Sequence, residues 1–344
     1  MNMTLETNDT TANIPGKEET ICWTIFHVLI VLLSLIGDTL ILIGTTRHKA
    51  IKLHRVLVVV IQHLAVSNLL LTLFRVLPTI VSLVAGDWVM GMLLCLVNLN
   101  VVVIVTPVTA ILTCVLSTFK TLIVQYPLKT HTWTRRRAHI VCALCWLTCV
   151  IRPRQIMNVF YASTESFFFD YIQYMCLVDL TSTPISFVRF QNFFIYFSFM
   201  VVLVVMIVTS VLLLFKARQA AVRDRQSVRW QGVLVVGLTT GVFLVSYLPD
   251  TIVPMIDNLT SVHPSSSIKR AACFFENVNI VANFFVYSLA VKSFRVFLST
   301  RIRQLIFQQS PPSTPLSAHR VRVERGLGSQ RNPLREPFTQ NSFV

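Results

Sequence analysis

The chain has 344 residues, of which 54% are hydrophobic and only 13% are charged, about half the charged share of an ordinary soluble domain. A soluble domain of this length covers its core with charged side chains, and 15 Asp and Glu residues cannot form such a surface. This composition nearly excludes a soluble enzyme and favours a bilayer as the solvent, in keeping with a mean hydropathy of +0.66. The net charge of +15 is compatible with nucleic-acid binding on composition alone, so the positions of the cations must decide.

Seven stretches of the chain are long and apolar enough to cross a bilayer as helices. A spanning helix needs about 20 mostly apolar residues, because each residue adds about 1.5 Å of rise across roughly 30 Å of hydrocarbon. The stretches run approximately from Trp23 to Thr45, Val56 to Val84, Met92 to Val124, Ala138 to Val159, Asn192 to Phe215, Val228 to Ile256 and Ile268 to Val291. The sequence therefore predicts an all-α membrane protein in which residues 23–291 form a seven-transmembrane helix bundle.

The segments outside these stretches differ in character. Residues 1–22 are polar and slightly acidic, and we expect no cleavable signal peptide there because they hold no apolar run. Residues 292–307 place large apolar side chains among basic ones, which predicts a short amphipathic eighth helix on the membrane surface. Residues 308–344 are rich in Pro, Ser and Arg, which predicts a disordered cytoplasmic tail.

The distribution of Lys and Arg predicts the orientation of the bundle. The connections after the first, third and fifth stretches, the segment from Lys292 onward and Lys120 hold 23 of the 30 cations, against Asp224, Glu324 and Glu336 as acids. By the positive-inside rule these parts are cytoplasmic. The sequence therefore predicts a multi-pass plasma-membrane protein with an extracellular amino terminus, and it assigns the positive charge to the membrane rather than to a nucleic acid.

The amino-terminal segment carries two N-glycosylation sequons. They are Asn2-Met3-Thr4 and Asn8-Asp9-Thr10, and a third, Asn258-Leu259-Thr260, falls close to the membrane at the outer end of the sixth stretch. An exposed terminus that faces the secretory lumen is accessible to the modifying enzyme. We therefore expect glycans at Asn2 and Asn8.

The eight cysteines divide by depth in the membrane. Cys114, Cys142, Cys145 and Cys149 fall inside predicted helices, where small buried thiols are expected. The other four fall on the outer, oxidising side: Cys22, Cys95, Cys176 and Cys273. Four cysteines permit three pairings.

Several short motifs stand at a spacing that allows comparison with one receptor family. They are Gly37-Asp38, Leu64-Ala65-Val66-Ser67-Asn68-Leu69, Cys95 placed 25 residues before Lys120, Pro127-Leu128, Trp146, Phe243-Leu-Val-Ser-Tyr-Leu-Pro249 and Asn283-Phe-Phe-Val-Tyr287. In this register, residues 22–306 resemble a divergent member of the rhodopsin-like (class A) G-protein-coupled receptors. The resemblance implies a non-enzymatic receptor without a cofactor, which transmits an extracellular ligand signal to heterotrimeric G proteins and binds arrestin.

The resemblance also assigns disulfides and activation positions. It favours a disulfide between Cys95 and Cys176, and we favour Cys22 with Cys273 as the second pair. It gives a part in G-protein coupling or activation to Phe119, Lys120, Thr121, Tyr247, Pro249, Asn283 and Tyr287.

Two of these motifs depart from the family pattern. Phe119-Lys120-Thr121 stands where the family has an acidic residue, Arg and an aromatic residue, so the restraining carboxylate is lost and Lys120 lacks the planar fork of Arg. Phe284 stands where the family has Pro in the seventh helix. The triplet allows two interpretations, a receptor that has lost coupling and one with a lower barrier to its active state.

Two polar residues of the inner bundle have changed places between the first and second helices. The family has Asn in the first helix and Asp in the second, whereas this chain has Asp38 and Asn68. An ionisable group at membrane depth needs polar partners. We therefore predict a polar network of Asp38 with Asn68, Thr109, Asn279 and Asn283, in which family-style sodium binding is altered.

The candidate ligand-binding positions disfavour two ligand classes. Val102 stands where amine receptors have Asp, and Asn277 stands where opsins have the retinal Lys. The charged candidates at a suitable depth are Arg75, Arg152, Arg154, Arg189, Asp250 and Glu276. The alternative interpretation is mutual pairing, such as Arg75 with Glu276 or with Asp250.

The long connection between the fourth and fifth helices points to a peptide ligand. Residues 159–162 and 167–176 are rich in strand-forming residues and flank the polar Ser163-Thr-Glu-Ser, which predicts a hairpin with its turn at 163–166. Such a hairpin is similar to that of peptide-binding members of the family. We favour an extracellular peptide ligand, with a small acidic or lipid ligand next.

Two further functional classes compete with a signalling receptor. Phe119, Lys120 and Phe284 motivate an atypical, non-signalling ligand-binding or scaffolding receptor, and a transporter or channel comes third because no repeat is evident. The sequence shows no metal-spaced His/Cys cluster and no phosphate loop, so we expect neither an enzyme nor a metal site. The carboxyl end Asn341-Ser342-Phe343-Val344 has a hydroxyl two residues before a terminal Val, which favours a PDZ protein as a partner.

Overall fold

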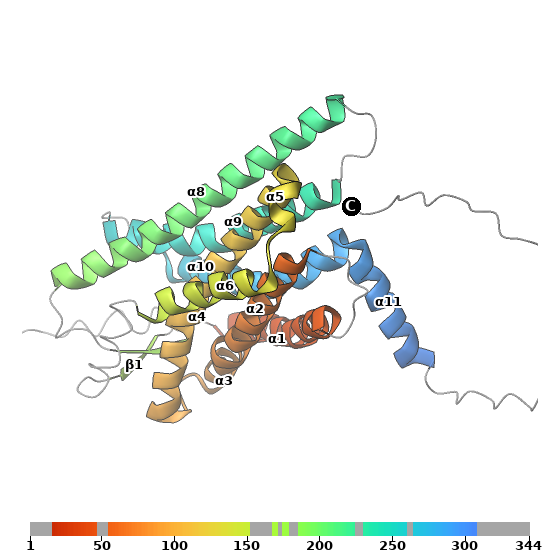
Figure 1. Ribbon diagram of the computed structural model, residues 1–344. Coiled ribbons are helices and arrows are strands. Elements are labelled where there is room, and N and C mark those ends of the chain that lie inside the picture. Colours follow the sequence, from red (N-terminus) through yellow and green to blue (C-terminus); the bar gives the residue numbers. More distant parts are fainter. Residues whose placement is uncertain are drawn as a thin grey trace, which may run out of the picture. The chain divides into compact units, whose positions relative to one another are not determined.

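The structure is a computed structural model of residues 1–344, and it describes residues 16–46, 54–151, 167–170, 174–178, 185–223, 230–259 and 264–307. The described elements carry the labels of Figure 1. They are α1 Lys17–Thr46, α2 Arg55–Leu71, the π-helix η2 Thr72–Val76, α3 Leu77–Ala85, α4 Gly91–Gln125, α5 Pro127–His131, α6 Arg135–Val150, β1 Phe167–Asp170, β2 Met175–Val178, α8 Ile185–Arg223, α9 Trp230–Leu259, α10 Ser266–Ala290 and α11 Lys292–Phe307. The predicted all-helical membrane class is confirmed.

Within the described residues, six helical segments are long and apolar enough to cross a membrane. They are Lys17–Thr46, Arg55–Ala85, Gly91–Ile123, Phe197–Lys216, Gly237–Asp257 and Ser266–Leu289, and α2, η2 and α3 together form the second of them. The predicted fourth span corresponds to α6, which is described over 16 residues, and residues 152–160 lie outside the described part of the chain. The first helix begins at Lys17, six residues before the predicted Trp23.

The six described spanning segments pack in a closed order. α1 contacts α2, α2 contacts α4, α4 contacts α8, α8 contacts α9, α9 contacts α10, and α10 returns to α1, while α6 packs against α2 and α4. Leu64, Leu112 and Leu116 are fully buried between the helices, whereas Leu33 and Val204 are exposed. Helices that are apolar on both their inner and outer faces suit a lipid surrounding.

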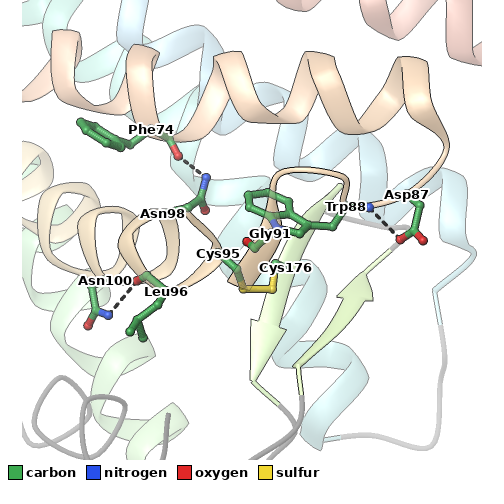
Figure 2. The surroundings of a disulfide bond; sticks show 9 residues. All are labelled: Phe74, Asp87, Trp88, Gly91, Cys95, Leu96, Asn98, Asn100 and Cys176. Carbon is green, nitrogen blue, oxygen red and sulfur yellow. Dashed lines mark hydrogen bonds between the residues drawn. A yellow bond between two sulfur atoms is a disulfide. The ribbon is translucent and has the colours of Figure 1, made fainter. Parts of the chain in front are cut away.

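A π-helical turn interrupts the second span and places Arg75. Pro78, the second residue of α3, has no backbone N–H, so the carbonyl of Phe74, four residues earlier, loses its helical donor. The side-chain amide of Asn98 on α4 donates to this carbonyl instead, as Figure 2 shows. The polar side chain of one helix thus satisfies the backbone of its neighbour where water is absent.

The hairpin of the long connection forms, but not with the predicted turn. β1 and β2 are antiparallel with Phe167 opposite Val178 and Asp170 opposite Met175, so the chain reverses between Asp170 and Met175. Tyr174 has φ of 51°, a left-handed value that a reversal uses. The predicted turn at 163–166 is therefore corrected, because the chain reverses inside the stretch 167–176 that was expected to form one continuous strand; residues 152–166 lie outside the described residues.

The chain divides into residues 1–302 and 303–344. α11 starts directly after Val291, over the range predicted for an amphipathic helix, and Phe294 and Phe297 are buried in the same apolar cluster as Tyr287. The predicted tail, residues 308–344, and the sequons at Asn2 and Asn8 lie outside the described residues.

Gly37 provides the close approach between α1 and α10. A Cβ atom at this position would lie 2.7 Å from Cγ and 2.8 Å from Cβ of Phe284. Phe284 is the residue that replaces the family's Pro, and its ring also meets Phe294 at a centroid distance of 6.3 Å. The larger side chain at 284 therefore fits because residue 37 has none.

We predict that Gly37→Ala lowers the free energy of unfolding by about 1–3 kcal/mol, because the new methyl group overpacks the Phe284 contact. Thermal unfolding of the purified protein in detergent measures the change. Gly241→Ala is the matched control, since nothing lies within 4 Å of its Cβ position. In a Phe284→Ala background the loss should shrink, and an equal loss in both backgrounds would contradict the contact.

Candidate functional site

One disulfide joins the hairpin to the bundle. Cys95 in the first turns of α4 bonds Cys176 of β2 with a Cα–Cα distance of 5.6 Å, as Figure 2 shows. We call the end of the bundle that holds this bond the disulfide end, and the opposite end the Lys120 end. Burial raises the pKa of the Tyr174 hydroxyl, in the turn of the hairpin, to about 12. The Tyr174 hydroxyl therefore keeps its proton to a higher pH than an exposed tyrosine does.

The second predicted disulfide is wrong for this structure. Within the described residues, Cys22 and Cys273 are both outside any disulfide. Cys22 is exposed on α1, while the neighbouring Trp23 faces α10 and packs on Phe274 with ring centroids 5.2 Å apart. Cys273 instead lies within electrostatic reach of Asp250, Arg75 and Glu276. The aromatic packing thus orients α1 so that Cys22 faces outward.

Arg75 and Glu276 form a buried ion pair between the second span and α10. The two guanidinium nitrogens of Arg75 donate to the two carboxylate oxygens of Glu276 at 2.6 and 2.5 Å. The side chains are only 11% and 7% exposed. Arg75 also donates to the Thr106 hydroxyl at 3.5 Å. The sequence left two interpretations open for Arg75, ligand contact and mutual pairing. In the structure Arg75 is paired, and its partner is Glu276.

Asp250 extends this pair toward α9. Its carboxyl group lies within electrostatic reach of Glu276, Arg75 and Cys273. Both terminal nitrogens of Arg75 are already bonded to Glu276, so Asp250 is a second carboxyl group near this cation. The result is a connected cluster of Arg75, Glu276, Asp250 and Cys273, which we call the outer polar cluster.

Aromatic side chains lie beneath the outer polar cluster. Tyr247, one turn before Asp250 on α9, is buried, stacks on Phe199 at 5.8 Å and contacts Phe243 at 4.5 Å between ring centroids. Its hydroxyl accepts a hydrogen bond from Asn279 of α10 at 3.3 Å. Pro249 lies inside α9, between Tyr247 and Asp250.

Some of the other predicted ligand positions lie in the described helices, and some lie outside the described residues. Val102 is buried on α4. Asn277 of α10 is 5% exposed, and its amide nitrogen lies 3.4 Å from Nε2 of His27 on α1. Arg152 and Arg154 lie outside the described residues, and α8 includes Arg189. The structure thus brings Arg75, Glu276, Asp250 and Asn277 together on facing helices.

The predicted polar network around Asp38 is smaller than expected. Asn68 donates to one carboxylate oxygen of Asp38 at 3.3 Å, and Ser34 donates to the other at 2.9 Å. Ser34 also bonds the Thr72 hydroxyl at 2.6 Å. Ser34 and Thr72 were missed, although Ser34 stands four residues before Asp38 on the same helix face.

The remaining predicted members of that network bind elsewhere. Thr109 donates to the carbonyl of Val105 in its own helix at 3.0 Å, and Asn279 donates to Tyr247. The side-chain nitrogen of Asn283 is buried and has no hydrogen-bond partner among the described residues. Helical hydroxyls can bond the preceding turn, so Thr109 needs no partner on another helix.

The Lys120 end is held by aromatic contacts. Phe119 meets Trp133, in the connection before α6, with ring centroids 5.2 Å apart. The ammonium group of Lys120 lies 5.5 Å from the centre of the Tyr287 ring on α10, is buried, and has no hydrogen-bond acceptor among the described residues. Thr121 donates to Ser117 at 2.9 Å and to Thr209 of α8 at 3.3 Å. The coupling positions therefore meet α8, α10 and the connection before α6.

Comparison with known proteins gives the family. The model of the 7 transmembrane receptor (rhodopsin family) matches residues 37–291, about three quarters of the chain. The chain belongs to this receptor family. The tachykinin-like peptides receptor 86C of Drosophila melanogaster is 29% identical over 140 residues, which are 40% of this chain. The matched region spans 27% of that receptor, so the chain corresponds to about a quarter of its length in this comparison.

Membership of the rhodopsin family makes the chain a multi-pass membrane receptor of the G-protein-coupled class rather than an enzyme. The class implies a ligand and a G protein as partners. The residues gathered at the two ends of this receptor, the outer polar cluster and the Lys120 contacts, are therefore its candidate ligand and coupling regions.

We predict that Glu276→Gln destabilises the receptor by about 3–5 kcal/mol, because it leaves the buried Arg75 guanidinium without its counter-ion. Thermal unfolding of the detergent-solubilised receptor measures the loss. The control is Asp257→Asn in the more exposed pair of Asp257 with Lys269, whose loss should stay at about 1 kcal/mol or less. A Glu276→Gln receptor that unfolds at the wild-type temperature would show that the pair does not hold the helices.

Proposed function

We propose that the chain is a plasma-membrane receptor with an extracellular amino terminus, and that its ligand is a peptide bound at the disulfide end. The hairpin supports this proposal, because Cys95–Cys176 ties its second strand to the start of α4, at the disulfide end, which also holds the outer polar cluster. The relative from Drosophila melanogaster supports it as well, since its name gives tachykinin-like peptides as its ligands.

In this proposal, the Lys120 end faces the cytoplasm and activates a heterotrimeric G protein. Most of the cations of the chain lie on this side by the positive-inside rule. In the structure the ammonium group of Lys120 lies over the Tyr287 ring of α10. A buried ammonium without an acceptor is poorly stabilised, so movement of the helices that gives Lys120 an acceptor favours the active state.

The second candidate function is a ligand-binding receptor that does not signal. Phe119 favours it, because this residue packs against Trp133 rather than restraining a neighbouring cation, so the polar switch of the family is absent at this position. Arrestin and a PDZ protein at Ser342–Val344 remain proposed partners. The tail that would bind them lies outside the described residues.

Guanine-nucleotide exchange in reconstituted membranes separates the two candidates. With tachykinin-like peptides as the probe, the wild-type receptor should raise exchange by at least one G protein above the background of receptor-free membranes. Lys120→Ala should lower that exchange about tenfold or more, because the only charge of the coupling triplet is removed. Lys17→Ala, which changes an exposed cation at the start of α1, is the control and should leave exchange unchanged.

The outcomes of this experiment differ for each part of the proposal. Exchange without added peptide that Lys120→Ala abolishes would support coupling and count against these peptides as ligands. Background exchange with every G protein, in a receptor that still binds the peptides, would support the non-signalling candidate.

A further inference from the structure

The side chain of Lys120 is a buried cation without a counter-ion. It is 7% exposed, and its Nζ atom has no hydrogen-bond acceptor among the described residues. The ion pairs in the described part of the chain use other cations, namely Arg75, Lys269 and Arg270. The Tyr287 ring, whose centre lies 5.5 Å from Nζ, attracts a cation but brings no negative charge. A buried charge without a partner is costly, so Lys120 calls for an anion.

Further unmet donors lie on the two helices that meet at Lys120. The hydroxyl of Tyr287, on the ring that Lys120 contacts, is buried and has no hydrogen-bond partner among the described residues. Ser117 stands one turn before Lys120 on the same face of α4, and Asn283 stands one turn before Tyr287 on α10. The Ser117 hydroxyl and the side-chain nitrogen of Asn283 are likewise buried and unpartnered in this part of the structure. Each of these four side chains can therefore donate a hydrogen bond to a bound acceptor.

The unmet amide groups elsewhere in the described bundle are of the opposite kind. Asn68, Asn98 and Asn277 each leave a side-chain oxygen without a donor, whereas Asn283 leaves a nitrogen without an acceptor. An oxygen calls for a donor, and a nitrogen or an ammonium group calls for an acceptor. The contact of α4 with α10 at the Lys120 end is thus where the described residues combine an unpaired cation with unmet donors.

The charge and burial of this end favour a small anion. The parts of the chain that the positive-inside rule assigns to this side hold 23 of the 30 cations, against Asp224, Glu324 and Glu336 as acids. A net positive region raises the local concentration of anions. Lys120 and Tyr287 are only 7% and 4% exposed, so they offer little surface to a bulky anion. A monovalent ion of the size of chloride meets both conditions.

We propose that Lys120 and Tyr287 bind a small monovalent anion, of the chloride type, between α4 and α10. The ammonium group supplies the opposite charge, the Tyr287 hydroxyl donates a hydrogen bond, and Ser117 and Asn283 offer further donors one turn deeper in the bundle. The anion links α4 to α10 and gives Lys120 an acceptor. It therefore opposes the helix movement proposed above for activation, because Lys120 then has a partner without that movement. The binding itself depends on neither the peptide ligand nor coupling.

Thermal unfolding of the detergent-solubilised receptor in chloride and in gluconate tests the site. Gluconate is a bulky anion, and sodium and ionic strength are held constant, so neither a cation site nor screening produces a difference. Chloride should raise the Tm of the wild-type receptor by about 3 °C at ten times its Kd, because a ligand that binds the folded state stabilises it. The rise should reach a plateau, whereas a general salt effect grows without one.

The variants assign the rise to this site. Lys120→Met should abolish it, and Lys120→Arg, which keeps the charge, should retain it. Tyr287→Phe keeps the ring but loses the hydroxyl, so it should raise the chloride concentration at half-maximal effect about tenfold. Lys129→Met is the matched control and should leave the rise unchanged, because Lys129 lies at a similar distance, 5.6 Å, from the centre of the Tyr126 ring but is exposed.

Two outcomes would overturn the inference. One is an equal Tm of the wild-type receptor in chloride and in gluconate, and this comparison needs no variant, so it decides even if Lys120→Met fails to fold. The other is a rise of the same size in Lys120→Met, which would assign the anion to another place. The measurement involves neither a peptide nor a G protein, so the anion site and the proposed function fail separately.

Discussion

Polar groups on a membrane-spanning helix cannot reach water, so each of them has to find a partner inside the bundle. Pro78 shows how far this constraint extends, since the carbonyl that it leaves open on Phe74 is bonded by Asn98 of another helix. The π-helical turn just before Pro78 includes Arg75, whose guanidinium group reaches Glu276 on α10. One local irregularity in the second span thus links it to α4 and to α10 and builds the outer polar cluster.

The two ends of the bundle satisfy this constraint by different means. At the disulfide end a covalent bond ties the hairpin to α4, and ion pairs join the helices, including Arg270 with Glu19 at 2.9 Å and Lys269 with Asp257 at 2.6 Å. At the Lys120 end the contacts are the aromatic pair of Phe119 with Trp133, the cation–π contact of Lys120 with Tyr287, and the hydrogen bond from Thr121 to the Thr209 carbonyl. Charged pairs fix one geometry, whereas apolar contacts are non-directional and tolerate repacking. Among the described residues, the ion pairs between helices lie at the disulfide end.

Apolar runs and motif spacing were enough to predict the family, the helical class and the Cys95–Cys176 bond, because they depend on hydropathy and on short-range order along the chain. The exchange of Asp38 and Asn68 also predicted their contact, since a buried carboxyl group needs a donor. Arg75 with Glu276 was one of two pairings left open. The choice between them depends on a π-helical turn, and the sequence indicates this turn by Pro78 alone. The prediction of a Cys22–Cys273 disulfide was wrong, because the direction of Cys22 depends on how Trp23 packs against Phe274. Trp133 was missed as the partner of Phe119, since nothing local links the two positions.

The departures from the family pattern lie on one path through the bundle. Phe284, in place of Pro, fits against Gly37, and the next residue on α1 is Asp38, which Asn68 binds in place of the family's Asp. Tyr287 lies about one turn along α10 from Phe284 and faces Lys120, which replaces Arg. Gly37 accommodates Phe284 because it lacks a side chain, and Asn68 offers a donor to Asp38. Lys120 lies over the Tyr287 ring but has no hydrogen-bond acceptor among the described residues. The altered positions on α1, α2 and α10 therefore form one packed set, which Lys120 of α4 joins through Tyr287.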